Sequence, residues 1–455
     1  MFFLKYHNNM MFNLDEIIEA SGAELIKNTS DSDDFNISTD TRTINKGDLY
    51  LPLKGASFDG ENFLSQAVDK GAAGCFITKD VYPENAKIVL KVKDTLGAYL
   101  SLARFLRRKY NPKTIAVTGS SGKTTTKEII FSVLEEKFKT HKTFSNHNNE
   151  IGFCETLMNM PQDCEILIVE MGMRGLGEIE LLSKYAEPDF AVITNAGSAH
   201  IGRLGSLDNI AKAKSEIVKY LKKDGTFISQ NNERIKKFAV FEGEKIFYSL
   251  DDVNIIDRKP SYSKFLYKDR EYEINVEGDY NIENSLAAIN LGYKLGMEYD
   301  EIRRGLAAYK PIEKRWEILD AGGYKVINDS YNANPESMKA AVSTFLQHYK
   351  HPVVVLGDMG ELGEMEDELH MEVGRYLAGL GYGKDAKYLT VGRLARQIGA
   401  ELDAKGFFVK NFENNREVSD YIIDTIDVGT TIFLKASRSM KFEEIIDFIK
   451  GEIKV

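Results

Sequence analysis

The sequence has few cysteines and no long apolar run, and both shortages exclude classes of protein. Its three cysteines, Cys75, Cys154 and Cys164, are odd in number and widely spaced, which excludes a disulfide framework and favours a reducing compartment. No apolar run approaches the roughly 18 residues that a membrane-spanning helix needs. The first eleven residues have neither a long apolar core nor a small-residue cleavage site. We therefore expect a cytoplasmic protein without a signal peptide.

The sequence also lacks an excess of positive charge. It has 59 lysines and arginines against 69 aspartates and glutamates, with a formal net charge of −10. No global positive field attracts nucleic acid, so a polyanionic ligand must be held by local basic side chains, helix ends and metal ions. At 455 residues the chain is too long for one compact core, and we expect two or three domains. Met1, Met10 and Met11 all remain open as the start of translation, because the first patterned helix begins just after them.

The most informative stretch is a strand, a glycine turn and a helix in succession. Apolar residues at 114–117 predict the strand, the turn follows at 118–125, and residues 127–134 predict the helix. Such a turn offers unpaired backbone N–H groups and the positive end of a helix to an anion. Lys123 can then reach the terminal phosphates of a nucleotide, and the hydroxyl of Thr124 can bind Mg²⁺. The stretch predicts a nucleoside triphosphate site and makes phosphoryl transfer the first hypothesis.

The turn differs from the usual phosphate-binding loop at one position. The usual pattern, G-x-x-x-x-G-K-[ST], needs glycine where this chain has Val117. The loop is therefore a shortened G-x-x-G-K-T-T form, which is less typical of GTPases and motor ATPases. Its place between a strand and a helix disfavours a chance glycine-serine turn.

Apolar strands alternate with helical segments along most of the chain, which predicts an α/β fold. Short strand-like segments between about 226 and 280, at 245–249 and 272–276, predict an antiparallel extension of the central sheet. We expect three domains, at residues 1–93, 94–312 and 313–455. Near-continuous apolar strands that indicate parallel sheets covered on both faces occur at 166–170, 190–194, 353–356, 388–391 and 431–434.

Polar side chains follow two successive strands of the predicted central sheet. Glu170 ends one strand, and His200 lies in the turn after the next. The carboxyl ends of strands face the crevice where α/β sheets bind ligands, so Glu170, His200 and Thr124 are candidate metal ligands around a triphosphate. The alternative is that Glu170 pairs with a lysine and His200 is a surface residue.

Two further pairs of residues leave alternatives open. Lys212 and Lys214 lie two apart on a predicted helix and point in different directions, and composition does not choose between them. Asn281 and Asn284 lie three apart on one helical face, where amides either cap the helix or read a nucleobase edge. Polar strand-to-helix turns at 328–337 and 435–439 are each weak indications of a site.

Taken together and in this order, these segments resemble the Mur ligase family over nearly the whole chain. The turn Thr118-Gly119-Ser120-Ser121-Gly122-Lys123-Thr124-Thr125 is similar to the shortened loop of that family. The stretches 145–152, 329–335 and 356–363 are similar to those of the branch that joins D-alanyl-D-alanine to a UDP-N-acetylmuramoyl-tripeptide. The Asp-Asn-Pro-Arg motif of the diaminopimelate-adding branch is absent, since the nearest stretch, at 413–416, does not match.

The resemblance implies an ATP-dependent amide ligase of peptidoglycan synthesis that works through an acyl phosphate. It implies a small N-terminal α/β domain that binds UDP, a central mononucleotide-binding domain that holds ATP and two Mg²⁺ ions, and a C-terminal Rossmann-like domain. The substrates would be UDP-N-acetylmuramoyl-tripeptide and D-alanyl-D-alanine, and we expect a monomer. Lys214 matches a lysine that the family carbamylates to make a metal-bridging carboxylate.

The resemblance also implies individual residue roles. The catalytic residues would be Lys123, Lys214, His200 and Glu170, and the metal ligands Thr124, Glu170, His200 and carbamylated Lys214. The nucleotide would contact Gly119, Ser120, Ser121, Gly122, Lys123, Thr124, Thr125, Asn281, Asn284, Arg315 and Asp329. The other substrates would contact Ser38, Asp40, Arg42, Lys54, Asn148, Asn149, Glu150, Tyr331, Asn334, Ser437 and Arg438. Ala436 stands where the family usually has glycine.

Two other functions remain open. Another ATP-dependent amide ligase of the superfamily, of the folylpolyglutamate or cyanophycin type, would share the central domain but would not need the stretch 145–152. A catalytically silent nucleotide-binding scaffold would not need Lys123, Glu170 and Lys214. Whether the third residue of the tripeptide is lysine or diaminopimelate also stays open.

Overall fold

The computed structural model describes residues 12–451 apart from residues 56, 146 and 313. Met1, Met10, Met11 and Glu313, where the third domain was expected to begin, lie outside the described residues.

The chain divides into two compact units. The first holds residues up to Ala116, with Lys139–Met171 and Leu181–Pro188. The second holds Val117–Phe138, Gly172–Glu180 and the chain from Asp189 onward. The expected limits at 93 and 312 stay a prediction.

A five-stranded sheet lies at the N-terminal end of the first unit, in the order β2-β7-β6-β5-β4. All its neighbouring strands are parallel except β2 and β7. Its strands β6 and β7 are apolar and almost wholly buried, as the near-continuous apolar pattern requires. The elements of this region are β1 (Phe12–Asn13), α1 (Leu14–Ser21), β2 (Glu24–Asn28), β3 (Asp34–Phe35), β4 (Ile37–Ser38), β5 (Leu49–Tyr50), α2 (Leu64–Asp69), β6 (Gly74–Ile77), β7 (Ile88–Lys91) and α3 (Thr95–Tyr110).

The central sheet has six strands in the order β13-β12-β11-β8-β10-β9. The printed registers of β9 with β10, β11 with β12 and β12 with β13 are all parallel. Each strand leads toward a loop at its carboxyl end, which is where this architecture binds ligands. The strands are β8 (Lys113–Thr118), β9 (Thr140–Lys142), β10 (Ile166–Glu170), β11 (Phe190–Ile193), β12 (Thr226–Gln230) and β13 (Glu244–Tyr248). The helices are α4 (Lys123–Leu134), α5 (Glu150–Met158), α6 (Glu178–Ala186), α7 (Ile201–Leu204), α8 (Leu207–Ser215), α9 (Glu233–Phe238), α10 (Asp279–Lys294) and α11 (Tyr299–Ala308).

The antiparallel strands expected in this part of the chain exist as a sheet of their own rather than as an extension of the central sheet, and one of the two strands assigned to them was placed wrongly. A separate antiparallel sheet consists of β14 (Val253–Lys259), β15 (Tyr262–Tyr267) and β16 (Arg270–Ile274). The segment at 245–249 instead forms β13, which pairs parallel to β12 at the edge of the central sheet. A short half-buried strand has the same alternation in both settings, so the pattern alone does not distinguish them.

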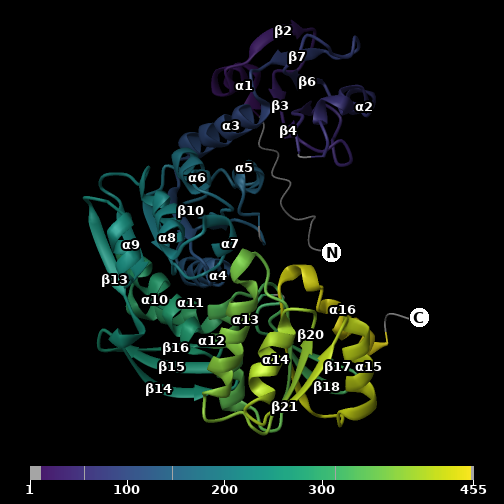
Figure 1. Cartoon of the computed structure of the whole chain (residues 1–455). Coiled ribbons are helices and arrows are strands. Elements are labelled where there is room, and N and C mark those ends of the chain that lie inside the picture. Colours follow the sequence, from purple (N-terminus) through teal and green to yellow (C-terminus); the bar gives the residue numbers. More distant parts are fainter. Residues whose placement is uncertain (1–11, 56, 146, 313, 452–455) are drawn as a thin grey trace. The chain divides into compact units, whose positions relative to one another are not determined.

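The C-terminal sheet also has six strands, in the order β17-β18-β22-β19-β20-β21. Only β17 is antiparallel to its neighbour, and helices accompany the parallel strands (Figure 1). The strands are β17 (Glu317–Ala321), β18 (Tyr324–Asn328), β19 (Val353–Gly357), β20 (Lys387–Val391), β21 (Phe408–Phe412) and β22 (Thr431–Lys435). The helices are α12 (Pro335–His348), α13 (Glu366–Ala378), α14 (Ala395–Asp403), α15 (Asn415–Thr425) and α16 (Glu443–Lys450).

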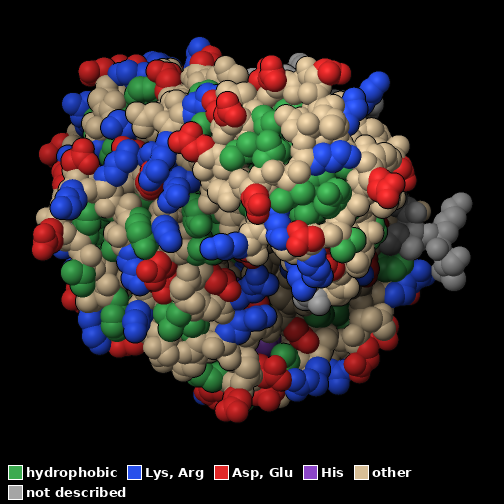
Figure 2. All heavy atoms as spheres, turned by 90° about the horizontal axis from the view of Figure 1, so that it is seen from above, with side chains coloured by type: hydrophobic (Ala, Val, Ile, Leu, Met, Phe, Trp, Pro, Cys, Tyr) green, Lys and Arg blue, Asp and Glu red, His purple; other side chains and the backbone are tan. Residues whose placement is uncertain are grey.

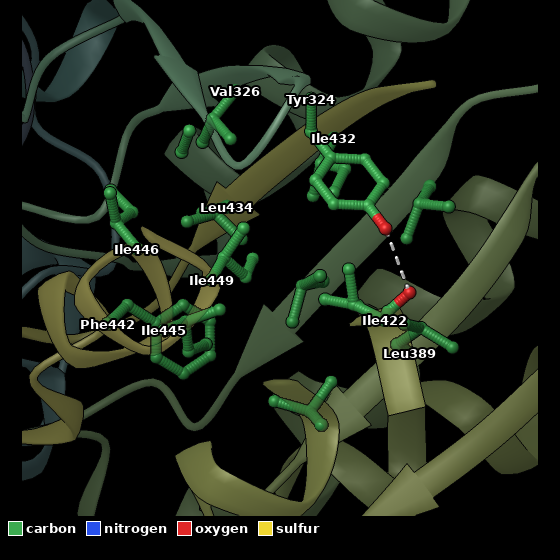
Figure 3. Packing of buried hydrophobic residues seen from close by; sticks show 14 of the residues in the cluster. Tyr324, Val326, Leu389, Ile422, Ile432, Leu434, Phe442, Ile445, Ile446 and Ile449 are labelled. Carbon is green, nitrogen blue, oxygen red and sulfur yellow. Dashed lines mark hydrogen bonds between the residues drawn. The ribbon is translucent and has the colours of Figure 1, made fainter. Parts of the chain in front are cut away.

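A hydrophobic core packs α15 and α16 against one face of this sheet (Figure 3). Ile432 and Leu434 of β22 point into this core, while Phe433 between them stacks on Phe345 of α12. This alternation is expected of a strand buried on both faces. Tyr324 is also buried here, and its hydroxyl donates to the backbone oxygens of Ile422 at 3.2 Å and of residue 426 at 2.9 Å. The C-terminal end of α15 is thereby joined to the sheet.

The surface carries charges of both signs. Lys and Arg side chains are interspersed with Asp and Glu on the face shown in Figure 2, with hydrophobic atoms between them. Among the described residues no helix is long and apolar enough to cross a bilayer. Mixed surface charge agrees with the absence of a single positive field that the sequence indicates.

Candidate active site

The phosphate loop connects the end of β8 to the start of α4 in the second unit. A Cβ atom on Gly119 would lie 1.8 Å from Thr194 Oγ1, and one on Gly122 would lie 2.8 Å from Asn284 Oδ1. Gly122 also has a φ of +75°, which disfavours other residues. Gly122 is the N-cap of α4 and supplies no side-chain cap, so the first N–H groups of the helix face the loop. The loop therefore has the open backbone surface that a phosphate group needs.

Asn195, whose role the sequence analysis missed, holds the loop in shape. Its Oδ1 accepts hydrogen bonds from the amides of Ser120 at 3.1 Å and Ser121 at 3.0 Å. Its Nδ2 donates to the Ser121 oxygen at 3.1 Å, and Thr194 Oγ1 donates to the same oxygen at 2.6 Å. Two loop amides that could hold a phosphate oxygen thus already point at one acceptor. Only the pairing of β11 beside β8 brings Asn195 here, so local sequence offered no signal.

Two lysines converge on one carbonyl oxygen of the loop. Lys123 Nζ and Lys214 Nζ each donate to the Gly119 oxygen at 2.8 Å. Lys214 is 1% exposed, whereas Lys212 is exposed, which decides between the two lysines that the helix pattern left open. Burial, and secondly the charge of Lys123, lowers the pKa of Lys214 well below its usual range. The Lys214 amine is therefore biased toward its neutral, nucleophilic form.

Arg315 reaches the first residues of α4 from the linker before β17. Its Nη2 donates to Thr124 Oγ1 at 2.9 Å, and its guanidinium carbon lies 3.9 Å from the centre of the Tyr331 ring. The buried Nε of Arg315 has no hydrogen-bond partner among the described residues. A buried guanidinium N–H without an acceptor beside an anion-binding loop fits a phosphate oxygen as the missing partner.

His200 contacts a carboxylate of the C-terminal sheet region. Its Nδ1 lies 2.5 Å from Glu361 Oε2, and Arg203 Nη2 lies 3.6 Å from the other oxygen. The hydrogen bond from His200 is the main cause that lowers the pKa of Glu361. The amide of Gly202 also donates to the Glu361 backbone oxygen at 3.1 Å. Glu361 lies in the stretch 356–363 noted in the sequence, but nothing local indicated that it would orient His200.

Glu170 ends β10 in the first unit and is buried. Asn148 Nδ2 donates to its Oε1 at 2.9 Å, and its own amide donates to Thr143 Oγ1 at 3.0 Å. Asn149 caps α5 by accepting from the amide of Gly152, and Glu150 is the first residue of that helix. Glu170 and the other three expected metal ligands belong to different units, so the four as one set stay a prediction. Within residues 12–451, as far as they are described, no three His, Cys, Asp or Glu side chains cluster as a metal site.

The residues expected to hold UDP lie in the first unit, with Ser38 at the end of β4 and the others after that strand. Arg42 forms an ion pair with Asp40 at 2.7 Å, with side-chain exposures of 86% and 36%. Hydrogen bonding from Arg42 lowers the pKa of Asp40. Ser38 Oγ donates to the Asp40 backbone oxygen at 3.3 Å, and Lys54 lies 3.9 Å from a carboxylate oxygen of Asp59. The two basic side chains, Arg42 and Lys54, each pair with a nearby carboxylate and are exposed.

The two asparagines of α10 do not cap that helix, because the N-cap is Gly278. Asn281 lies in the first turn and donates from Nδ2 to the Glu277 oxygen at 2.7 Å. Asn284 is buried beside the phosphate loop, as the close approach to Gly122 shows. The capping alternative for Asn281 is therefore wrong.

The remaining expected residues lie in turns of the C-terminal sheet region. Asp329 accepts from the Trp316 amide at 3.2 Å and pairs with Lys435. Asn334 caps α12 by accepting from the amide of Ser337, and Ser437 Oγ contacts Ser439 Oγ at 3.1 Å.

Arg438 belongs to the same turns and forms an ion pair with Glu443 at 3.2 Å. Ala436 is buried, and a Cβ on Gly357 would lie only 2.7 Å from its methyl group. The alanine at 436 is accommodated by a glycine opposite.

Comparison with known families agrees with this arrangement. The model of the Mur ligase middle domain matches residues 117–292, and that of the Mur ligase, glutamate ligase domain matches residues 314–438. Together these two models cover more than half of the chain. The chain belongs to the Mur ligase family.

Individual Mur ligases match over nearly the whole length. The UDP-N-acetylmuramoyl-tripeptide–D-alanyl-D-alanine ligase of Bacillus subtilis is 37% identical, over 95% of this chain and 98% of its own. The protein of that name from Escherichia coli is 30% identical, over 90% and 92%. MurF from Acinetobacter baumannii superposes with a TM-score of 0.89 at 29% identity, covering 97% and 99%, which confirms the α/β fold.

Two further solved structures are similar to this chain: one contains ADP, and the other is a folylpolyglutamate synthase. MurF from Thermotoga maritima, solved in complex with ADP, superposes with a TM-score of 0.81 at 25% identity, covering 92% and 97%. A folylpolyglutamate synthase from the same organism reaches 0.55 at 16% identity over 78% and 94%, which shows the common fold alone. The prediction of an enzyme of the Mur ligase family is confirmed: the chain is a ligase of this family.

Proposed function

We propose that this Mur ligase joins D-alanyl-D-alanine to a UDP-N-acetylmuramoyl-tripeptide, using ATP, to form the pentapeptide precursor of peptidoglycan. The observation that carries the proposal is the convergence of Lys123 and buried Lys214 on the Gly119 oxygen of the phosphate loop. Relatives that bear the name of this activity match 95% and 90% of the chain, which supports the choice of substrates.

In the first step the terminal carboxylate of the tripeptide attacks the γ-phosphorus of ATP. A carbon-bound oxygen forms a new bond to phosphorus, the bond from phosphorus to the ADP oxygen breaks, and an acyl phosphate results. Lys123, the loop amides and Arg315 would stabilise the charge on the transferring phosphoryl group and on the leaving ADP. Their donors all lie at the loop, where they bond Asn195, Gly119 and Thr124.

In the second step the free amine of D-alanyl-D-alanine attacks the carbonyl carbon of the acyl phosphate. A tetrahedral intermediate forms, the amine loses a proton, and phosphate leaves as the new amide bond is completed. Water would hydrolyse the acyl phosphate, so closure of the C-terminal domain around the substrates would protect it while aligning the amine.

We further propose that Lys214 is carbamylated. Its neutral amine would add to CO₂ and lose one proton, which gives a carbamate. Deep burial and the lowered pKa support this, because only the unprotonated amine reacts. Thr124 and Glu170 would hold one Mg²⁺, and His200 with the Lys214 carbamate a second. Bound Mg²⁺ would offset the negative charge of the phosphates.

The remaining expectations complete the proposal. Residues 1–93 would bind the UDP moiety through Ser38, Asp40, Arg42 and Lys54, residues 94–312 would bind ATP, and residues 313–455 would admit the dipeptide. The enzyme would act as a monomer in the cytoplasm, where ATP is available.

The test is phosphate release from ATP and Mg²⁺ with UDP-N-acetylmuramoyl-tripeptide, with and without D-alanyl-D-alanine. We expect release that requires both substrates and a pentapeptide product identified by mass. Lysine and diaminopimelate tripeptides, compared in parallel, would identify the third residue. No release with either tripeptide would favour a folylpolyglutamate-type or cyanophycin-type ligase. ATP binding without any carboxylate-dependent release would favour a silent scaffold.

A further inference from the structure

A buried carboxylate connects three segments of the second unit. Glu277 lies between β16 and α10 and is fully buried. Its Oε1 accepts hydrogen bonds from Trp316 Nε1 at 2.6 Å and from the Tyr349 hydroxyl at 3.3 Å. Trp316 belongs to the linker before β17, and Tyr349 follows α12. One side chain of the middle region thus holds both the linker and a helix end of the C-terminal region.

The linker has an unusual backbone that its surroundings must maintain. Lys314 and Trp316 both have positive φ values, of +59° and +58°. Side chains of this kind rarely adopt that conformation, and it persists where packing determines it. The indole of Trp316 packs with ring centres 6.3 Å from Tyr280 and 5.5 Å from Phe433. The bond to Glu277 fixes the rotation of the indole within this aromatic pocket.

Arg315 lies between these two strained residues and contacts the phosphate loop. Its Nη2 donates to Thr124 Oγ1 at 2.9 Å. Because Arg315 and Trp316 are adjacent in the linker, the placement of the indole sets the direction in which Arg315 leaves the backbone. Glu277 is thus linked to the contact with Thr124 through two adjacent residues, Trp316 and Arg315, and is not in contact with the loop in the part of the chain that the structure describes.

We propose that Glu277 is a positioning residue for the ligase reaction: it holds Trp316 and thereby keeps Arg315 at the phosphate loop. The proposal rests on the proposed function only for its kinetic readout. Its structural readout is independent, because Trp316 is the single tryptophan of the chain and its fluorescence reports this contact directly.

The charge of Glu277 gives a way to test the contact. Burial raises its pKa to about 7, while the donors Trp316 and Tyr349, and the positive charge of Lys325 on β18, act in the opposite direction. An ionised carboxylate is a stronger acceptor for the indole N–H than a protonated carboxyl group. The hydrogen bond should therefore strengthen as the pH rises through about 7.

The other groups around this site are two tyrosines, Asp329 and His348. Burial raises the pKa of Tyr349 and of Tyr280, so both stay neutral near pH 7. Asp329 accepts from the Trp316 amide and is paired with Lys435. His348 on α12 is the group to control for, because burial and then Arg258 lower its pKa and Asp279 lies close to it.

The first experiment measures Trp316 emission of the full chain between pH 5.5 and 8.5, a range that brackets the value near 7. We expect a transition near pH 7 in the natural protein that Glu277→Gln abolishes and His348→Gln leaves in place. Glu277→Gln keeps the size of the side chain and an acceptor oxygen, so its folding should be preserved. Absence of the transition in the natural protein, or its survival in Glu277→Gln, would overturn the proposal.

The second experiment is a double-mutant cycle on the KM for ATP and on kcat. Glu277→Ala and Trp316→Phe should each lower kcat roughly tenfold, with no further fall when combined, because both displace Arg315 from the transferring phosphoryl group. Glu277→Gln should restore most of the loss. Glu283→Ala, which removes a half-buried carboxylate of α10 that accepts from Gln230, is the matched control and should leave both constants unchanged. Additive effects, or equal effects of Glu283→Ala, would contradict the role of Glu277.

A natural protein that makes no pentapeptide would instead refute the proposed function and would leave the fluorescence result valid.

Discussion

The phosphate loop and the turn that carries Asp40 and Arg42 are both expected to bind phosphorylated ligands, yet they are built differently. Around the loop, Lys214 and Thr124 are buried, and their hydrogen bonds join segments far apart in the sequence. In the N-terminal turn, Arg42 pairs with a carboxylate two residues away, and most of its side chain is exposed. The basic side chains of the loop are held by tertiary contacts, whereas Arg42 is held by an ion pair within its own turn.

The two kinds of site have different functional requirements. A site that stabilises a transition state must have its donors aligned before the reaction, because reorganisation would raise the barrier. A site that only recognises one end of a substrate can align its side chains on binding. Changes in the loop should therefore reduce kcat, whereas changes in the turn should raise the KM of one substrate.

The largest effect is expected from Lys123→Ala. Removal of a cation directed at the transferring phosphoryl group should lower kcat by roughly 10²- to 10³-fold or more. The measurement is phosphate release at saturating substrates, with thermal unfolding as a check that the variant is folded. Lys113→Ala, at the exposed start of β8, is the control. Near-normal turnover of Lys123→Ala would refute the assignment of the loop.

The second largest effect on activity is expected from Lys214→Ala, compared with the same change at a neighbouring lysine of α8. We expect Lys214→Ala to be inactive, because it would lack the proposed carbamate, and Lys212→Ala to retain activity, because Lys212 is exposed. Short carboxylic acids such as acetate should partly restore Lys214→Ala by supplying the missing carboxylate. Full activity of Lys214→Ala without additives would remove this residue from the mechanism.

A smaller effect is expected in the N-terminal turn. Arg42→Ala should raise the KM for the UDP-linked tripeptide roughly tenfold and leave kcat and the KM for ATP unchanged, as the loss of a contact shared by ground and transition states does. The melting temperature should not change measurably, because exposed ion pairs contribute little to stability. A fall in kcat with an unchanged KM would contradict the expectation that the turn only recognises the substrate.

The smallest effect on activity is expected in the C-terminal core. Tyr324→Phe removes a hydroxyl that donates to two backbone oxygens of the α15 region and should lower the free energy of unfolding by about 1 kcal/mol. Urea unfolding would measure this loss, and kcat and both KM values should be unchanged. A change in kcat would mean that the core is coupled to the loop more closely than the contacts indicate.

Local patterns in the sequence predicted the parts of this fold that are themselves local. The order of strand, glycine turn and helix at 114–134 was recognisable because its apolar pattern and its glycine spacing lie within one short stretch of sequence, and near-continuous apolar runs indicated the parallel sheets in the same way. The prediction that residues 245–249 form an antiparallel strand was wrong. Their pattern fits parallel and antiparallel pairing equally, and only the neighbouring strand β12 distinguishes the two.

What the sequence by itself determined is therefore the α/β fold, the phosphate loop and the resemblance to Mur ligases. Only the tertiary structure decided that Lys214 rather than Lys212 meets Gly119, that Asn195 holds the loop amides, and that Glu277 holds Trp316. Each of these contacts joins residues at least 39 positions apart. Such contacts form when burial on folding brings distant elements together, and no short stretch of sequence contains both partners.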